Sequence, residues 1–314
     1  MTTGQNRAWR SVVALTGGVG GAKLVDGLAQ ALPPGVLTAV VNTGDDFEHW
    51  GLHVSPDLDT NMYTLGNLAH VERGWGLADE SFRTLEMIRR YGGDAWFQIG
   101  DRDLGTHLVR TQALRRGETL TRVTTRLCEA LGVGPRLLPM ADGWCRTMIE
   151  TDGHGTQSFQ DWFVLARAAP AVRAIRWEGD PPATPEVLAA IDAAEVVIIG
   201  PSNPYVSIDP ILTRAGVREA LLRKRVIALS PIVGGQAVKG PLATMIPQLT
   251  GQPASAAAIA RHYEGLLAGL MVEHGDEAGL DGLPIASGRT IMTDRPDRAR
   301  LAREVLDFAG RIVG

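Results

Sequence analysis

Short apolar runs alternate with segments of helical spacing along most of this chain. Val12 to Leu15 is a short apolar run that predicts a buried strand. Residues 22–32 carry apolar side chains at helical spacing, and a Pro-Pro-Gly sequence ends that pattern. Residues 36–41 form a second apolar run. This order of strand, turn, helix and strand predicts a parallel sheet with right-handed crossovers.

The middle of the chain is less regular. Residues 42–60 read as an irregular acidic loop. Four stretches of helical spacing follow, near residues 61–69, 79–91, 105–116 and 119–131. Residues 133–184 contain short alternating pieces, which predict a smaller α/β domain inserted in the chain.

The alternation of helices and strands resumes after this segment. Helices are expected near residues 185–194, 217–223, 255–266 and 297–312, and strands near 195–199, 226–229 and 269–273. The sequence therefore predicts an α/β protein with a Rossmann-like, doubly wound and mainly parallel sheet. Residues 1–132 and 185–314 form the nucleotide-binding and substrate-binding core in this prediction, and residues 133–184 form the insertion.

Composition narrows the classes of partner. The 314 residues are 45% hydrophobic and 21% charged, with a net charge of −4, so the basic surplus of a nucleic-acid binder is missing. No run approaches the ~20 apolar residues of a membrane span. Residues 1–10 are polar, and the apolar run 11–15 that follows them is too short for a signal-peptide core. The two cysteines show no metal-type spacing, which predicts a cytoplasmic location. We expect neither a nucleic acid nor a membrane as partner.

The turn at residues 16–24, T-G-G-V-G-G-A-K-L, is the first candidate site. Glycines let a backbone approach a phosphate closely, and the helix start offers free amides and a positive dipole end. Lys23 stands out because the chain has only three lysines. A dinucleotide fingerprint fails at Lys23 and at Asn42, which replaces the expected acid. A Walker A loop fails at Ala22 and Leu24. The alternative is a plain tight turn.

Carboxylates form the second candidate site. Asp45 and Asp46 follow the second strand, where open α/β sheets bind ligands. Asp57 and Asp59 lie two residues apart and would share one side of an extended segment. Hard oxygen ligands near a phosphate suit Mg²⁺. The alternatives are a solvated acidic loop or helix capping by Asp59 or Thr60.

Three further motifs carry polar groups. Residues 100–107, G-D-R-D-L-G-T-H, precede a predicted helix, and capping with a local ion pair competes with a binding role. The loop 201–204, P-S-N-P, and Ser207 follow an apolar strand and point to ligand contact. Ser230 and Pro231 follow the next strand, and they point to ligand contact more weakly. The esterase motif G-x-S-x-G and the zinc-protease motif H-E-x-x-H are both missing.

Taken together, six ordered motifs resemble one family, the 2-phospho-L-lactate transferases of coenzyme F-420 biosynthesis. The motifs are GGVGGAKL at 17–24, VNTGDD at 41–46, SPDLDT at 55–60, GDRDLGTH at 100–107, GPSNPYVSIDPIL at 200–212 and SPIVGG at 230–235. They extend over nearly the whole chain.

The resemblance implies a Rossmann-like homodimer that requires Mg²⁺. Its acceptor is the deazaflavin Fo (7,8-didemethyl-8-hydroxy-5-deazariboflavin), and its donor is a guanylylated three-carbon acid. The terminal ribityl hydroxyl of Fo attacks the phosphorus that carries the phospholactyl, phosphoenolpyruvyl or phosphoglyceryl group, and GMP leaves. Displacement at phosphorus needs charge neutralisation and in-line positioning more than a covalent catalyst.

The resemblance also assigns site residues. Asp59 and Asp45 are the catalytic candidates, with Asp59 at a position that contacts Fo, and Asp45 and Asp57 are the candidates for the metal. The substrate-binding candidates are Gly18, Gly20, Gly21, Lys23, Asp46, Thr60, Asn61, Gln98, Asp101, Arg102, His107, Ser202, Asn203, Pro204, Ser207 and Ser230. Gln98 stands where some relatives carry a basic Fo contact. We expect Asp59→Asn to lose most turnover while folding normally.

Two other classes remain as alternatives. A related group of UDP-sugar-binding regulatory proteins shares the glycine-rich turn and the Rossmann-like core, and binding of Fo rather than a UDP-sugar would separate the two. An NAD-dependent oxidoreductase is disfavoured by Lys23 and Asn42.

Overall fold

A seven-stranded sheet forms the centre of the molecule. The computed structural model describes residues 7–314. The expectation that residues 1–10 contain no targeting segment therefore falls largely outside the described residues. The strands run in the order β14-β13-β10-β9-β1-β2-β5, and every neighbouring pair is parallel. Their bounds are β1 Val12–Thr16, β2 Leu37–Val41, β5 Arg136–Pro139, β9 Val196–Ile199, β10 Val226–Leu229, β13 Gly269–Glu273 and β14 Ile285–Gly288.

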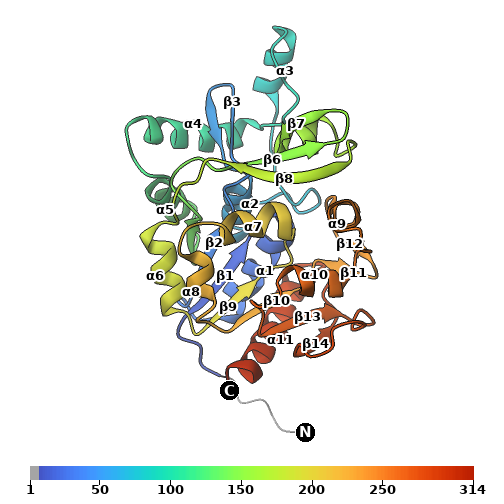
Figure 1. Ribbon diagram of the computed structural model, residues 1–314. Helices are drawn as coiled ribbons and strands as arrows, with labels where there is room; N and C mark the ends of the chain where they lie inside the picture. Colours follow the sequence, from blue (N-terminus) through green and yellow to red (C-terminus); the bar gives the residue numbers. More distant parts are fainter. Residues whose placement is uncertain (1–6) are drawn as a thin grey trace.

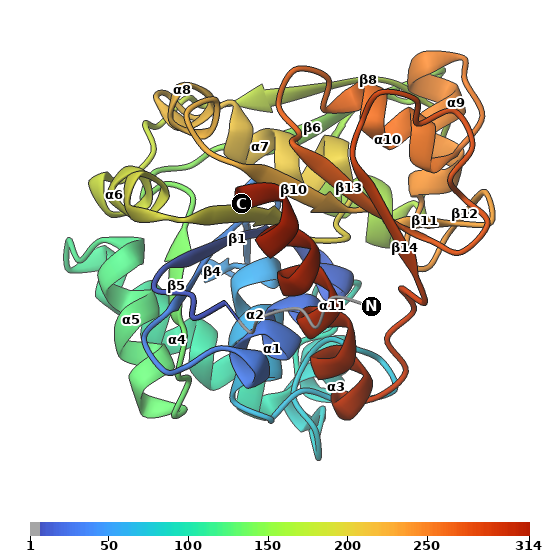
Figure 2. The same cartoon turned by 90° about the horizontal axis from the view of Figure 1, so that it is seen from below.

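Helices cover both faces of this sheet (Figure 2). Val12 and Ala14 of β1 pack with α1 and α11 on one face, whereas Val13 and Leu15 pack with α6, α8 and α10 on the other. Successive side chains of a strand point to opposite faces, so β1 is apolar at every position. The bounds are α1 Gly18–Ala31, α6 Pro185–Ala193, α8 Val217–Leu221, α10 Ala256–His262 and α11 Arg295–Val313. This layering confirms the predicted doubly wound α/β fold.

The order of the strands reverses at β1. The chain leaves β1 toward β2 and β5 and later returns on the other side with β9 and β10. The loops after β1 and β9 therefore diverge at one point of the sheet edge, and doubly wound sheets bind their ligands at that point.

Smaller elements gather above this edge (Figure 1). An antiparallel three-stranded sheet has the order β7-β6-β8, and a hairpin joins β3 to β4. The bounds are β3 Phe47–His49, β4 Leu52–Val54, α2 Pro56–Leu65, α3 Arg83–Arg90, α4 Asp101–Arg115, α5 Leu120–Ala130, β6 Arg146–Thr151, β7 Gly155–Ser158, the π-helical turn η1 Asp161–Leu165, and β8 Val172–Glu178. β5 lies within residues 133–184 but pairs with β2 of the large sheet, and the predicted division of the chain into a core and an insertion stays a prediction.

The remaining elements belong to the C-terminal part of the chain, between β9 and α10. They are the π-helical turn η2 Pro204–Ile208, α7 Asp209–Leu212, β11 Ile232–Val233, β12 Gln236–Ala237 and α9 Leu242–Thr250. Among residues 7–314, no helix is both long and apolar enough to cross a bilayer.

Two local predictions are wrong. Residues 42–60 are not an irregular loop, because they contain the β3–β4 hairpin and the start of α2. Pro56 occupies the first turn of α2 and two aspartates follow it there, which is a helix-start pattern that stabilises the positive end of the dipole. Likewise Asp101 to Asp103 do not precede a helix but form the first turn of α4.

Candidate functional site

A cavity of about 670 Å³ lies over the carboxyl ends of β1, β2, β9 and β10. It occupies the edge of the sheet at which the strand order reverses, where a ligand is expected. The predicted site residues that line it are Gly18, Gly20, Lys23, Asp45, Asp57, Asp59, Thr60, Gln98, His107, Ser202, Asn203, Ser207 and Ser230. The fold therefore brings together most of the residues that the sequence singled out.

The glycine-rich turn forms one wall of this cavity. The Gly18 amide donates to Asp57 Oδ1 at 2.7 Å, and Gly18 adopts φ +64°, a conformation that favours glycine. α1 begins at Gly18 and its N-cap, Gly17, supplies no side-chain cap. Amides in the first turn of a helix lack an intrahelical acceptor. The Gly18 amide is taken by Asp57, so the amides of Val19 and Gly20 are the ones available to an anionic group of a ligand.

The loop after β9 packs directly on this turn. Ser202 Oγ accepts the Gly17 N–H at 3.2 Å and donates to the Gly17 carbonyl at 2.8 Å. A Cβ atom on Gly20 would lie 2.6 Å from the Pro201 carbonyl oxygen, so a larger residue has no room there. The two loops thus form one continuous wall with defined geometry.

Asn42, which breaks the dinucleotide fingerprint, ties a third loop to this wall. Its Nδ2 donates to Asp57 Oδ2 at 2.9 Å and to the Val206 carbonyl at 3.2 Å. Its Oδ1 accepts the Gly44 amide at 2.8 Å. An amide can donate and accept at once, whereas a carboxylate can only accept. The departure from the fingerprint therefore has a structural reason.

Two buried carboxylates meet at this junction. Burial raises the pKa of Asp57 to about 6, although the hydrogen bonds from Asn42 and Gly18 oppose the shift. Burial and the neighbouring charges of Asp57 and Asp46 raise the pKa of Asp45 well above its usual range. Asp45 Oδ1 is buried and has no hydrogen-bond partner among the described residues. Unpaired buried anions are costly, so this pair fits a cation.

Asp46 points away from the main cavity. Its Oδ2 accepts a hydrogen bond from Ser55 Oγ at 2.7 Å and lies 3.0 Å from His53 Nε2. It lines a separate hollow of about 370 Å³ together with Trp144, whose ring lies 4.4 Å from that of His53. Asp45 and Asp46 are adjacent in sequence, but they line two different cavities.

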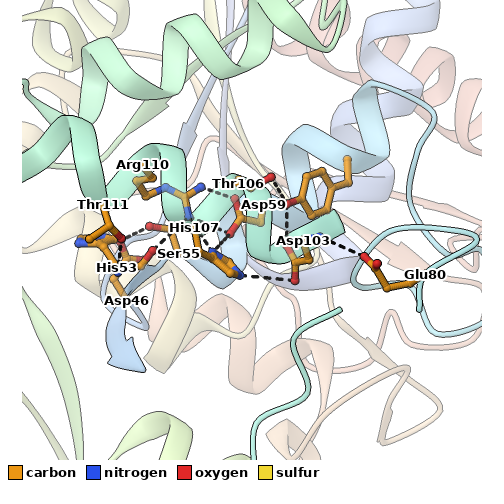
Figure 3. A network of polar contacts seen from close by, with 11 residues as sticks. Asp46, His53, Ser55, Asp59, Glu80, Asp103, Thr106, His107, Arg110 and Thr111 are labelled. Carbon is orange, nitrogen blue, oxygen red and sulfur yellow. Dashed lines mark hydrogen bonds and ion pairs between the residues drawn. The ribbon is translucent and has the colours of Figure 1, made fainter. Parts of the chain in front are cut away.

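Asp59 belongs to a buried ionic network (Figure 3). Both of its oxygens accept hydrogen bonds from Arg110, one of them at 3.1 Å. His107 lies between Asp59 and Asp103, with Nδ1 at 3.7 Å from Asp59 Oδ2 and Nε2 at 3.5 Å from Asp103 Oδ2. Tyr63 donates to Asp103 Oδ1 at 2.6 Å, and burial raises the pKa of Tyr63 well above its usual range.

The prediction that Asp57 and Asp59 share one side is wrong. Both residues belong to α2 rather than to an extended segment. Residues two apart on a helix lie about 200° apart around its axis. Asp57 therefore faces the glycine-rich turn, whereas Asp59 faces α4 and Arg110.

A second cluster of side chains, formed between α2 and α4, also resembles a metal site. Asp59, Asp103 and His107 are a group of three whose ligand atoms lie within 4.8 Å of one another in the described part of the chain. Arg110 occupies both oxygens of Asp59 and reaches His107 Nδ1 at 3.3 Å. A fixed cation there disfavours a second one. Asp45 and Asp57 remain the better candidates for a metal.

Six predicted site residues do not line the main cavity: Gly21, Asp46, Asn61, Asp101, Arg102 and Pro204. Asp101 accepts the amides of Arg83 and Thr84 and so caps α3. Arg102 donates to the Ala78 carbonyl at 2.9 Å. Asn61 donates to the Asp57 carbonyl at 2.8 Å within α2. These residues therefore stabilise the segments that line the cavity without lining it themselves.

The sequence reasoning missed a second lysine in the lining, Lys239. Lys23 donates to the Met292 carbonyl at 3.3 Å and Lys239 to the Arg73 carbonyl at 2.6 Å. Neither ammonium lies within 4.0 Å of a carboxylate in the described residues. Burial, followed by the charges of Arg298 and Lys239, lowers the pKa of Lys23. Two cations without a counter-charge suit an anionic ligand, and the scarcity of lysine was the available signal.

Aromatic side chains also line the cavity without having been predicted. Phe159 and Phe163 stack with their ring centroids 5.3 Å apart. Trp96 and Phe97 also line the cavity, and Phe97 packs edge-on against Phe47 with the ring centroids 4.8 Å apart. Aromatic residues make up only 5% of the chain and come from distant segments, so no local pattern revealed them. They give the cavity flat apolar surfaces that suit a planar ring system.

Comparison with known proteins gives consistent results. The sequence model of the family described as 2-phospho-L-lactate transferase CofD matches residues 12–278. A phosphoenolpyruvate transferase of Streptomyces griseus is 43% identical over 96% of this chain and 99% of its own length. A protein of the same description from Mycobacterium ulcerans is 41% identical, over 95% of this chain and 98% of its own.

A similar solved structure comes from a more distant protein. The crystal structure of a UPF0052-family member from Bacillus halodurans superposes with a TM-score of 0.67 at 19% identity. The match covers 96% of this chain and 100% of the other. At this identity it supports the fold alone.

Proposed function

The chain belongs to the CofD family of 2-phospho-L-lactate transferases, and we propose that the group it transfers is phosphoenolpyruvyl. As a CofD-type transferase it moves a phospholactyl or phosphoenolpyruvyl group onto the deazaflavin Fo in coenzyme F-420 biosynthesis. Membership of this family sets aside the UDP-sugar-binding regulator and the NAD-dependent oxidoreductase. The names of the similar Streptomyces and Mycobacterium proteins support the enolpyruvyl donor.

The observation that supports transfer from a guanylylated donor to Fo is the composition of the main cavity. An anion-binding helix start, two unpaired lysines, buried carboxylates and flat aromatic walls line one space. A guanylylated acid brings a diphosphate, and Fo brings a planar ring with a polyhydroxyl chain. The cavity offers a chemically matched surface for each of these parts.

In the proposed reaction the terminal ribityl oxygen of Fo forms a bond to the phosphorus that carries enolpyruvate. The bond from this phosphorus to the oxygen bridging it to the guanylate phosphorus breaks, and GMP leaves with that oxygen. The hydroxyl proton passes to a carboxylate of the cavity. Asp59 orients the hydroxyl, because its oxygens are already fixed by Arg110.

The residues present fit a divalent cation at Asp45 and Asp57. Asp45 has a buried oxygen without a partner among the described residues, and burial is the main cause that raises the pKa of both carboxylates. Mg²⁺ bound there supplies neutralisation of the charge on the diphosphate. The amides at the start of α1 help to neutralise the charge on the remaining phosphate oxygens.

A homodimer in the cytoplasm completes the proposal. The dimer is what the family resemblance suggests. The location is supported by the two cysteines, Cys128 and Cys145, which are both free and buried.

The test is mass spectrometry of the product formed from Fo with each guanylylated acid in turn, in the presence of Mg²⁺. We expect the enolpyruvyl donor to give the fastest formation of a phosphoenolpyruvyl-Fo product, with one GMP released per product. Faster transfer of lactate or glycerate would contradict the choice of donor. A complete lack of product with all three donors would contradict the proposed function itself.

A further inference from the structure

A stripe of polar residues on α4 faces a matching stripe on α2. Asp103, His107 and Arg110 are spaced by four and three residues, which places them on one face of α4. Asp59 and Tyr63 are spaced by four residues on α2. Arg110 binds Asp59 and Tyr63 binds Asp103. The two helices therefore meet through an ordered network rather than through apolar contacts alone.

The members of this network differ in their access to the cavity. Asp59, Asp103, Tyr63 and His107 line the cavity. Arg110 does not line it, and its side chain is only 1% exposed. Arg110 therefore cannot touch a ligand in the cavity, and any effect it has on the reaction passes through Asp59.

The contact between Arg110 and His107 determines which nitrogen of the imidazole carries the hydrogen. A guanidinium donates and never accepts, so His107 Nδ1, 3.3 Å from Arg110 Nη1, is the acceptor. The imidazole hydrogen then resides on Nε2, which is directed to Asp103 Oδ2 at 3.5 Å. His107 Nε2 is buried and makes no hydrogen bond within normal distance in the described residues. Hydrogen bonds at an active site are often long in the unliganded protein and tighten when the substrate binds.

We propose that Arg110 and His107 are positioning residues, which hold Asp59 and Asp103 as fixed acceptors for two hydroxyls of the polyhydroxyl acceptor chain. Ligand atoms of the two carboxylates lie within 4.8 Å of each other on the cavity wall. Charge-assisted hydrogen bonds to ionised acceptors are among the strongest neutral-ligand contacts available. This inference rests on the proposed function, because it assumes that Fo is the acceptor.

The start of α4 is built to hold this stripe in register. Glu80 accepts the amide of Arg102 at 2.7 Å and that of Asp103 at 3.1 Å. A Cβ atom on Gly100 would overlap the Glu80 side chain, so this close approach requires glycine. The carboxylate satisfies two amides of the first turn and stabilises the positive end of the helix. Asp103 is thereby placed directly at the cavity wall.

The experiment uses steady-state kinetics with the full chain, Fo, the enolpyruvyl donor and Mg²⁺. Arg110→Lys keeps the charge but removes the two-pronged contact, and we expect kcat/KM for Fo to fall about tenfold or more. The dissociation constant for GDP should stay within about twofold of wild type, since the phosphate-binding wall is separate. Arg116→Lys is the matched control, because Arg116 is the exposed residue that caps the C-terminus of α4.

A second pair of variants keeps the proposal testable where Arg110→Lys fails to fold. His107→Gln has an amide that reaches Asp103, whereas the shorter amide of His107→Asn reaches only the position of Nδ1. We expect His107→Gln to retain kcat/KM for Fo within about threefold and His107→Asn to lose about tenfold. Equal activity of the two, or equal losses in Fo and GDP binding, overturns the positioning role. An inactive wild-type enzyme instead overturns the proposed function.

Discussion

At the scale of single residues, the carboxylate of Asp59 depends on one neighbour. Its side chain is 7% exposed and that of Arg110 is 1% exposed, so water cannot replace either partner. Removing one member of a buried ion pair leaves an unpaired charge in a medium of low polarity. This consequence could not be read from the motif SPDLDT.

We therefore revise the expected behaviour of Asp59→Asn. The variant should lose most of its turnover, because the acceptor hydroxyl loses an ionised partner. It should also lose stability, by about 3 kcal/mol, since Arg110 remains buried and charged. Urea denaturation followed by circular dichroism measures the change. Asp152→Asn, at an exposed position far along the chain, serves as control, and a variant with wild-type stability would show that Arg110 finds another partner.

At the scale of elements, the site depends on how closely the start of α1 approaches the loop after β9. Gly21 does not line the cavity. A Cβ atom at Gly21 would nevertheless overlap Thr16 Oγ1 and come within 2.6 Å of Ser202 Oγ. Its glycine is thus required for packing of the two loops rather than for ligand contact.

Gly21→Ala should therefore separate the two loops and distort the wall that we propose binds the phosphates. We expect a loss of about 1–3 kcal/mol in the free energy of unfolding, as for other overpacked positions, together with weaker GDP binding. Calorimetric titration with GDP and thermal denaturation measure both effects. Gly134→Ala is the control, because a Cβ atom there meets nothing within 4 Å. If GDP binding stays at the wild-type level, the close contact between the loops is not needed for the site.

At the scale of the whole molecule, the cavity combines unpaired charges of both signs. Lys23 and Lys239 have no carboxylate within reach in the described residues, and Asp45 has an oxygen without a partner. Such an arrangement stores unfavourable energy in the empty protein and releases it when ligand and metal bind.

This arrangement predicts a pH-dependent stability. The folded pKa of Asp57 is raised from 3.8 to about 6, so the folded state holds an extra proton between these values. Stability of the metal-free protein should fall as pH rises from about 4 to about 6, by roughly 3 kcal/mol at most from this group. Asp45 adds to this fall, because burial also raises its pKa well above the usual range.

Mg²⁺ should reverse this loss by stabilising the ionised carboxylates. We expect the metal to raise the melting temperature at pH 7.5 more than at pH 5, with EDTA abolishing the gain. Asp45→Asn should melt higher than wild type in EDTA at pH 7.5 and respond little to Mg²⁺, because it removes a buried charge. A scanning-fluorimetry series over pH and Mg²⁺ measures both, and identical responses of wild type and variant would rule out this metal site.

Most of the strands and helices of the large sheet, and the place of the glycine-rich turn, could be predicted from the sequence alone. Apolar runs such as residues 12–15 and 196–199 predict buried strands because both faces of a doubly wound sheet are covered. The glycines at 17–21 and the aspartates after the second strand lie where the fold places ligands, and the cavity includes Gly18 and Asp45. These features are local, so the order of residues along the chain is enough to reveal them.

Which polar groups face one another could be learned only from the folded protein. Asp59 lies 51 residues from Arg110, and Lys23 and Lys239 reach the cavity from segments far apart in the chain. The direction in which Asp57 and Asp59 point also followed from the helix that contains them, not from their spacing. Contacts between distant segments depend on how helices pack, and no local pattern of residues encodes that packing.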